Sequence, residues 1–339
     1  MNPFSAKENR MYSRFLDVCR AFLVGLLVLP IISSYNLTGQ NSPPTAAPEE
    51  EVTGELPPGI DPVTFKQRVD LVNVLCSVVN KDAHSFITNL SKNDFMLYED
   101  NKLQKIEIFA GETNLPLTLA MLIDTSASVA PKLQFEQEAA TSFFQNVLKE
   151  KDRALLLEFD SGVTLRQDFT DDANKLAQEI WKLRAAGGTA LYDAIYMVCD
   201  QKLIRESGRK AIIILSDGED SASDTTLREA MEMALRAEAA IYAISVSKGG
   251  FFGVGDNREG DNTLKDMAEE TGGKIFFPFK VEELFDAFRQ ISQELRSQYN
   301  LGYYSTNTIR DGKYRKLKVR VTERGLELNY RKGYYAPKG

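Results

Sequence analysis

The sequence is poor in the side chains on which most catalytic nucleophiles and zinc sites depend. Histidine occurs once, as His84, in 339 residues, which excludes zinc sites with several histidines and disfavours mechanisms with a histidine base. Three cysteines are too few to indicate a disulfide framework. No G-x-S-x-G elbow is present, so the usual setting of a serine nucleophile is missing. Carboxylates and hydroxyls are the chemical groups that remain.

An excess of positive charge is also missing from the chain as a whole. The formal net charge is −7 at pH 7 and the isoelectric point is about 5.1, so nucleic acid is not the expected partner. The exception is 298–339, where ten basic residues stand against three acidic ones. Basic and apolar residues alternate over 316–321, which predicts a strand with a solvated face. Contact with a polyanion is the alternative interpretation of this segment.

Long apolar runs are rare, and the one near the N-terminus is short. The run "AFLVGLLVLPII" (21–32) follows several arginines and is shorter than the roughly 20 residues that span a bilayer. Residues 1–34 are therefore predicted to be a signal peptide of an exported protein, which is periplasmic, secreted or anchored in the cell envelope. Because no clean A-x-A site follows, an uncleaved membrane tether is the alternative. Residues 35–62, rich in proline, glycine and glutamate, predict a flexible linker.

Two kinds of periodicity divide the rest of the chain. Residues 63–114 and 298–339 alternate as strands do, whereas 115–297 alternates short apolar strands with amphipathic helices. The run "LTLAMLID" (117–124) is apolar throughout, as in a strand buried on both faces. Helices are predicted near 131–149, 171–184, 190–206, 225–238, 263–271 and 281–296. We predict an α/β fold with a doubly wound, mainly parallel, Rossmann-like sheet, inserted in a small β-domain that both flanks form.

A few single features are assigned to packing or to the surface. Cys76 and Cys199 share apolar faces with their neighbours, and Trp181 lies on a helical apolar stripe, so we expect all three to be packed. His84 is expected at the surface. The glycine-rich segment 247–262 lacks the order of a phosphate-binding loop; we expect a surface loop there, and contact with a partner is the alternative.

Polar side chains gather at the ends of the predicted buried strands. Asp124, Ser126 and Ser128 follow one strand, Asp217 ends another, and Thr189 follows a Gly-Gly turn before a helix. In an open α/β sheet, ligands bind outside the carboxyl ends of the strands. Hard oxygen ligands with few carboxylates suit Mg²⁺, with Ca²⁺ or Mn²⁺ as alternatives. Two aspartates and three hydroxyls leave the metal under-neutralised, so a Glu or Asp of a partner protein is expected to complete the shell.

Each of these motifs also has a purely structural interpretation. Serine, threonine and aspartate are preferred caps at the start of a helix, and Asp217 followed by Gly218 is a turn signal. The conjunction of three motifs on the correct loops favours the metal site. Capping of the next helix and metal binding make different contacts, which the tertiary structure can distinguish.

Residues 115–297 resemble a von Willebrand factor A domain. Asp-x-Ser-x-Ser, a threonine and an aspartate form that family's metal-ion-dependent adhesion site, and they fall on Asp124, Ser126, Ser128, Thr189 and Asp217. Further stretches over 63–337, including "FDSGVTLRQDFT", "GGTALYDAIY" and "RKGYYAP", resemble a related family abundant in acidobacteria. The resemblance implies an exported or envelope-associated bacterial protein that is not an enzyme and that binds a protein ligand through Mg²⁺. In related domains the C-terminal helix shifts when ligand binds, but the sequence does not tell whether helix 281–296 moves.

Two other classes of function compete with this interpretation. A metal-dependent hydrolase could use a similar sheet, but phosphatases of the haloacid dehalogenase type start from Asp-x-Asp. Here the second position is Ser126, which cannot serve as a general acid at neutral pH. The other alternative is an envelope scaffold with a vestigial metal site. The sequence does not identify the partner, the metal used in the cell or the oligomeric state.

Overall fold

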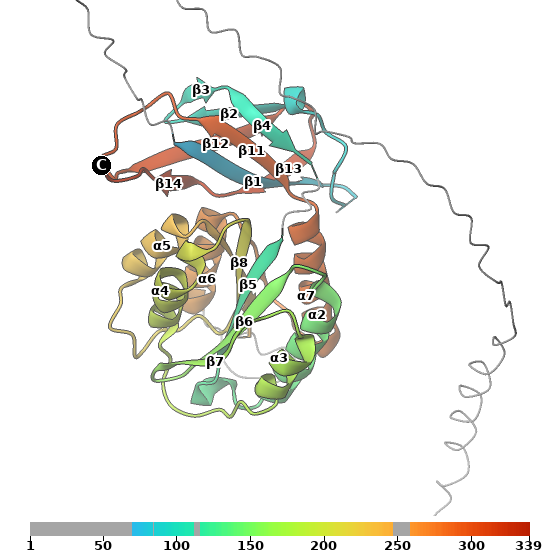
Figure 1. Ribbon diagram of the computed structural model, residues 1–339. Coiled ribbons are helices and arrows are strands. Elements are labelled where there is room, and N and C mark those ends of the chain that lie inside the picture. The colour runs from blue at the N-terminus through green and yellow to red at the C-terminus, as the bar shows by residue number, and fades with distance from the viewer. Residues whose placement is uncertain (1–69, 84, 112–115, 247–257) are drawn as a thin grey trace, which may run out of the picture. The chain divides into compact units, whose positions relative to one another are not determined.

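A computed structural model describes residues 70–83, 85–111, 116–246 and 258–339. The predicted signal, the linker, His84 and most of the glycine-rich segment lie outside these ranges. The described residues form one six-stranded sheet and two four-stranded sheets (Figure 1). No helix among them is long and apolar enough to span a membrane.

The six-stranded sheet has the strand order β10-β9-β8-β5-β6-β7. Its members are β5 (Leu117–Asp124), β6 (Arg153–Phe159), β7 (Val163–Thr170), β8 (Arg209–Ser216), β9 (Ala239–Ser245) and β10 (Ile275–Phe276). All pairs are parallel except β6 with β7, which form a hairpin at the sheet edge. Every residue of β5 and β8 is buried, as their continuous apolar runs require. Strands β5 and β8 therefore form the buried centre of the sheet, and the β6–β7 hairpin forms one of its edges.

Helices cover both faces of this sheet. One face packs against α2 (Leu133–Val147), α3 (Ala173–Ile180) and α7 (Val281–Arg296). The other packs mainly against α4 (Leu191–Gln201), α5 (Leu227–Arg236) and α6 (Arg258–Thr271). Alternate side chains of β5 point into the two cores, since successive residues of a strand face opposite sides. The predicted doubly wound α/β fold is confirmed.

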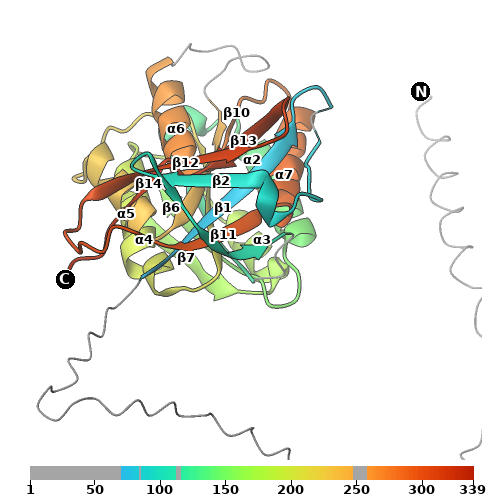
Figure 2. The same cartoon turned by 90° about the horizontal axis from the view of Figure 1, so that it is seen from above.

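The two flanks of the chain fold together into a β-sandwich. One sheet has the order β13-β1-β11-β4 and the other β14-β12-β2-β3 (Figure 2). The N-terminal flank supplies β1 (Leu71–Asn80), β2 (Phe95–Glu99), β3 (Lys102–Gln104) and β4 (Ile106–Ala110). The C-terminal flank supplies β11 (Tyr299–Tyr304), β12 (Tyr314–Val321), β13 (Leu326–Tyr330) and β14 (Gly333–Tyr335). Because β1 pairs with β11 and β13, and β2 pairs with β12, neither flank forms this core alone.

Several local predictions need correction. Trp181 is 44% exposed rather than packed, because α3 ends at Ile180 and the helical spacing stops there. Helix α6 begins at residue 258, earlier than the predicted 263. The predicted helix over 190–206 ends at Gln201 and is followed by a 3₁₀ turn, η3 (Leu203–Arg205). Cys76 and Cys199 are buried, as predicted.

A buried carboxylate joins helix α7 to the sandwich. Glu294, near the end of α7, is 3% exposed. Its Oε1 accepts hydrogen bonds from Ser77 Oγ on β1 and Asn329 Nδ2 on β13, both at 2.7 Å. Burial raises the pKa of this carboxyl group. Since a buried carboxylate needs such partners, the two bonds fix the exit of α7 against the sandwich.

Candidate metal centre

Asp124 is fully buried at the carboxyl end of the central strand β5. Its Oδ1 accepts a hydrogen bond from the Ser126 amide at 2.8 Å, and its Oδ2 accepts one from Ser216 Oγ at 2.6 Å. Ser216 is the last residue of the neighbouring strand β8. One backbone amide and one side-chain hydroxyl therefore hold the carboxylate at the edge of the sheet. Sequence analysis missed Ser216, although it directly precedes Asp217.

A chain of side-chain oxygens links the loop after β5 to the loop after β8. Ser126 Oγ lies 3.0 Å from Ser128 Oγ, and Ser128 Oγ donates to Asp217 Oδ2 at 2.9 Å. Ser126 is buried, whereas Ser128 is exposed. The structure thus brings four of the five predicted ligands into one hydrogen-bonded group that reaches the surface.

These side chains do not cap the following long helix. Helix α2 begins at Leu133 with Lys132 at its N-cap, and no side-chain capping bond is found there within the described part of the chain. A 3₁₀ turn, η2 (Ala127–Val129), separates the motif from α2. The hydroxyl of Ser128 instead contacts Asp217. Capping of α2 therefore does not account for the Asp-x-Ser-x-Ser pattern.

Thr189 is the fifth predicted ligand, and its loop is tied to the same edge. The Ala186 amide donates to Thr125 O at 2.7 Å, and Gly187 O accepts from the Ala127 amide at 3.2 Å. The Thr189 amide donates to Ser221 Oγ at 3.1 Å. Thr189 itself is buried. The backbone bonds hold this loop beside residues 125–127, the segment that contains Ser126.

Two glycines allow the loops to approach this closely. Gly187 has φ +77°, and a Cβ there would lie 2.7 Å from Ser161 Oγ, which accepts a hydrogen bond from the Gly188 amide. Gly218 has φ +78°, and a Cβ there would lie 2.3 Å from Gly260 O. Both conformations favour glycine because side chains destabilise the left-handed region. Ser161 therefore supports the loop that carries Thr189.

The electrostatics of the edge favour a cation. Burial raises the pKa of Asp124 to about 6, while hydrogen bonds from Ser126 and Ser216 counteract part of this effect. On α2, burial and then the charge of Asp124 raise the pKa of Glu136 to about 8, against the charge of Lys132. Neither carboxylate oxygen of Glu136 has a hydrogen-bond partner among the described residues. A divalent cation would offset this negative potential.

Glu136 carried a weak signal in the sequence. It stands three, four and seven residues before Ala139, Ala140 and Phe143, on the apolar face of an amphipathic helix. An acidic residue at such a position is rarely fully buried without a partner. The pattern could have identified Glu136 as a buried acid, but not its proximity to Asp124.

The donor set fits a hard divalent cation. It comprises two aspartates, two serines and a threonine, and oxygen ligands of this kind suit Mg²⁺. No group of three or more His, Cys, Asp or Glu side chains gathers in the described ranges, so this site depends on hydroxyl groups. The six-stranded α/β region contains no histidine, and Ser126 stands at the position where phosphatases of the haloacid dehalogenase type carry their second aspartate.

Comparison with solved structures finds proteins of similar fold and low identity. An aerotolerance-related membrane protein from Bacteroides fragilis is 17% identical, with a TM-score of 0.44, over 53% of this chain and 98% of that chain. The protein BatB from Bacteroides thetaiotaomicron is 18% identical, with a TM-score of 0.44, over 53% and 97%. The vWF domain of the type V pili tip protein Mfa5 from Porphyromonas gingivalis is 16% identical, with a TM-score of 0.43, over 53% and 95%. Comparison with curated proteins gives no match.

The family comparison is more specific. Residues 119–219 match the family model of the von Willebrand factor type A domain. This segment runs from β5 to just beyond Asp217, and it includes all five predicted metal ligands. The β-sandwich lies outside the match, and the wider resemblance over 63–337 stays a prediction. On this match, the chain contains a von Willebrand factor type A domain.

Proposed function

We propose that Asp124, Ser126, Ser128, Thr189 and Asp217 bind a divalent cation, foremost Mg²⁺ and alternatively Ca²⁺ or Mn²⁺. The observation that carries the proposal is the continuous group of oxygens from Ser126 through Ser128 to Asp217. It joins two loops that are 89 residues apart in sequence. Burial, and to a smaller extent the charge of Asp217, raises the pKa of Asp124. The charge of the cation would offset the cost of burying this carboxylate and its repulsion by Asp217.

The cation in turn would bind a Glu or Asp carboxylate of a partner protein. The octahedral shell of Mg²⁺ has six positions, and the ion usually keeps water at several of them while it binds one or two carboxylates. A carboxylate of the partner would replace one of these waters. Ser128 is exposed, so a ligand can approach from solvent. The proposed function is therefore non-catalytic, metal-dependent protein binding or adhesion. With residues 1–34 as a signal or membrane tether, we place this function outside the cytoplasm, in the cell envelope or secreted.

Titration calorimetry with MgCl₂ tests the metal site directly. We expect saturable binding by the full chain and its loss in Asp124→Ala and in the double variant Ser126→Ala/Ser128→Ala. Asp286→Ala is the matched control, because Asp286 is a half-exposed carboxylate on α7. Mg²⁺ binding that survives in Asp124→Ala and in the double variant would contradict the proposed ligands.

A pull-down from envelope extracts tests the partner. We expect proteins that are retained with Mg²⁺ to be released by EDTA and to be missing with Asp124→Ala. Identical sets of proteins in all conditions would instead favour an envelope scaffold with a vestigial metal site. Turnover of a generic phosphoester by the wild type but not by Asp124→Ala would favour the hydrolase.

We further propose that occupancy of the metal site is coupled to the sandwich through α7. This helix ends at Arg296, and β11 begins three residues later, while Glu294 contacts Ser77 and Asn329 of the sandwich. A shift of α7 would therefore strain these two bonds. Hydrogen exchange over 281–304 is expected to change when Mg²⁺ and a captured partner are added. Unchanged exchange would remove the coupling but leave the metal site intact.

A further inference from the structure

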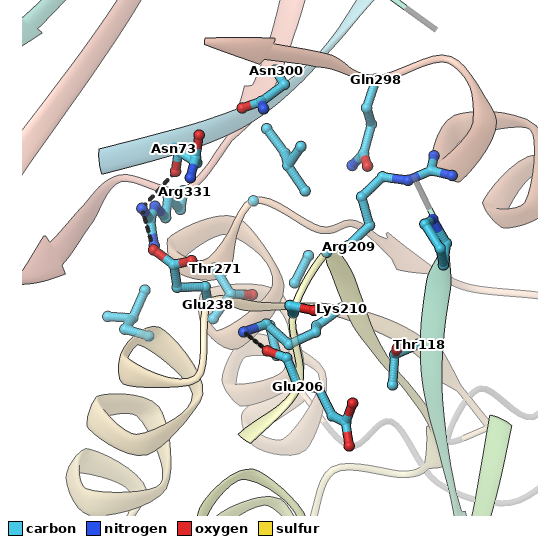
Figure 3. A pocket seen from close by; sticks show the side chains of 18 of the residues that line it. Asn73, Thr118, Glu206, Arg209, Lys210, Glu238, Thr271, Gln298, Asn300 and Arg331 are labelled. Atoms are coloured by element: carbon cyan, nitrogen blue, oxygen red, sulfur yellow. Dashed lines mark hydrogen bonds and ion pairs between the residues drawn. The ribbon is translucent and has the colours of Figure 1, made fainter. Parts of the chain in front are cut away.

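A large basic cavity lies at the amino ends of the same parallel strands. It has a volume of about 800 Å³. Its walls come from the starts of β8 and β9 and from the sandwich strands β1 and β11 (Figure 3). Five basic and two acidic residues line it, so positive charge exceeds negative by three. The cavity is distinct from the metal edge, which lies at the carboxyl ends of these strands.

Arg331 presents unused hydrogen-bond donors to this cavity. It is 7% exposed, and its Nη2 donates to Asn73 O at 2.6 Å and to Glu238 Oε1 at 3.0 Å (Figure 3). Its Nε and Nη1 are buried and have no hydrogen-bond partner within the described part of the chain. Buried donors without partners are costly. Nε and Nη1 lie on different edges of the guanidinium, so each can donate a separate hydrogen bond to a ligand oxygen, while the fixed positive charge attracts an oxyanion.

The acidic residues of the cavity do not neutralise its remaining charge. Glu238 already contacts Arg331, and Glu206 forms an ion pair with Arg153. Lys210 is 8% exposed, and its Nζ donates to the backbone oxygen of Glu206 at 3.1 Å. Burial lowers the pKa of this amine. An anion in the cavity would therefore meet Lys210 as well as Arg331.

Unused acceptors accompany the unused donors. Gln298 Oε1 and Asn300 Oδ1 are buried and lack a hydrogen-bond partner among the residues that the structure describes. An inorganic anion without protons cannot satisfy such acceptors, whereas hydroxyl groups can. Both residues lie on the short segment that leaves α7 and enters β11. The ligand that satisfies both kinds of group carries an oxyanion and several hydroxyls.

We propose that this cavity binds a small hydroxylated oxyanion, of the class of a sugar phosphate or a sugar acid. Its oxyanion pairs with Arg331 and Lys210, and its hydroxyls donate to Gln298 and Asn300. Water occupies the cavity when this ligand is absent, as is usual for roomy polar sites. The volume of about 800 Å³ lies within the range of small-molecule sites.

Titration calorimetry with four probes tests the ligand class. The probes are glucose 6-phosphate, glucuronate, inorganic phosphate and glucose, each added to the full chain in EDTA. We expect glucose 6-phosphate or glucuronate to bind in a saturable manner and at least about tenfold more tightly than phosphate or glucose, because neither of these satisfies both sets of groups. The stronger of the two sugar anions identifies the phosphate or the carboxylate as the preferred oxyanion. No saturable binding by any probe at millimolar concentration would overturn the proposal.

Three variants locate the binding site. Arg331→Lys keeps the charge but removes the Nε and Nη1 donors, Lys210→Gln removes a charge, and Asn300→Asp places a carboxylate in the wall. We expect each to weaken binding of the better sugar anion by about tenfold or more. Arg320→Lys and Asn101→Asp are the matched controls on exposed positions of the sandwich, and they should bind as the wild type does.

Folding of each variant is checked by circular dichroism. If Arg331→Lys fails to fold, Asn300→Asp still tests the site. It replaces an amide by a carboxylate of nearly the same size, and basic side chains surround the new charge. Wild-type affinity in all folded variants would overturn the site. Asp124→Ala should bind the sugar anion normally, so loss of the metal site and loss of this cavity are distinguishable.

Discussion

The two ends of the parallel sheet carry opposite charge. Strand β8 begins with Arg209 and Lys210 and ends with Ser216, which Asp217 follows. Eight extended residues separate these ends by roughly 26 Å. The acidic end gathers hydroxyls and carboxylates, where we propose a cation, whereas the basic end gathers guanidinium, amine and amide groups, where we propose an anion. One set of buried strands thus positions two groups of side chains of opposite chemistry.

The ends also differ in how they are closed. Three loops of the α/β region meet at the acidic end, where backbone hydrogen bonds join them. At the basic end the sandwich supplies part of the wall, through Asn73, Asn300 and Arg331. The acidic site therefore depends on local loop geometry. The basic cavity depends instead on how the sandwich packs against the amino ends of the parallel strands.

The largest effect is expected from Gly218→Ala at the acidic end, compared with Gly208→Ala at the basic end. Both glycines have positive φ, +78° and +86°, but a Cβ at Gly218 would lie 2.3 Å from Gly260 O, against 3.1 Å from Pro116 O for Gly208. We expect Gly218→Ala to lower the free energy of unfolding by about 3–5 kcal/mol, through strain and overpacking. Gly208→Ala should cost about 1–2 kcal/mol. Urea denaturation measures both, and equal losses would contradict the difference in crowding.

The next largest loss of stability is expected from Glu294→Leu, which removes the hydrogen bonds between α7 and the sandwich. Loss of the carboxylate leaves Ser77 Oγ and the Asn329 amide without their acceptor. We expect a loss of about 3–4 kcal/mol in the free energy of unfolding. Glu294→Gln keeps an acceptor oxygen and should stay within about 1 kcal/mol of the wild type. Equal stability of the two variants in urea would show that these hydrogen bonds do not hold α7 against the sandwich.

Glu136→Gln should change how the free energy of unfolding depends on pH, because Glu136 is a buried acid beside the acidic end. The pKa of Glu136 is raised from 4.5 to about 8 by burial, so between these pH values the folded protein holds a proton that the unfolded chain has lost. Its contribution to stability is therefore full below about pH 4.5 and declines as pH rises towards 8. The variant lacks this decline.

In EDTA, we expect Glu136→Gln to exceed the wild type in free energy of unfolding by about 2–3 kcal/mol at pH 8.5. At pH 4.5 the difference should be small, because both side chains are then neutral. Thermal and urea unfolding at the two pH values measure it. A difference that does not grow with pH would show that Glu136 is ionised in the folded protein.

The smallest effect is expected from Lys151→Gly at the rim of the basic cavity. Lys151 is exposed and has φ +74°. Glycine at this position relieves backbone strain in the folded protein, but it also raises the conformational entropy of the unfolded chain, so the two effects oppose each other. We expect the free energy of unfolding to stay within about 1 kcal/mol of the wild type. The affinity for the better sugar anion should fall by about threefold, as for an exposed charge. A tenfold loss would instead place Lys151 inside the site.

Sequence patterns predicted the fold because buried parallel strands and amphipathic helices have distinct periods. The predicted helix over 281–296 coincides with α7 (Val281–Arg296). Helix α6 was harder, since its first residues are polar and include Gly260, which weakens the helical signal. The backbone of Gly260 explains a different glycine, since a Cβ at Gly218 would lie 2.3 Å from Gly260 O.

The same reasoning placed the metal-site residues at one edge but did not give their contacts. Asp124, Ser126 and Ser128 share a strand end, so local spacing was sufficient to group them. The hydrogen bond from Ser128 to Asp217 spans 89 residues, and periodicity does not determine such pairings. Glu136 shows the limit most clearly. It is buried with no hydrogen-bond partner among the described residues, and this depends on how α2 packs against the sheet.

By itself, the sequence determined the strands, the helices and the kinds of side chain at the acidic end, because these follow from local patterns of burial and from the direction of parallel strands. Only the tertiary structure decided that Arg331 meets Glu238 and Asn73, which lie 93 and 258 residues away. The basic cavity exists because the sandwich docks on the amino ends of the strands. Such docking depends on the fit of distant surfaces, and no local pattern in the chain encodes that fit.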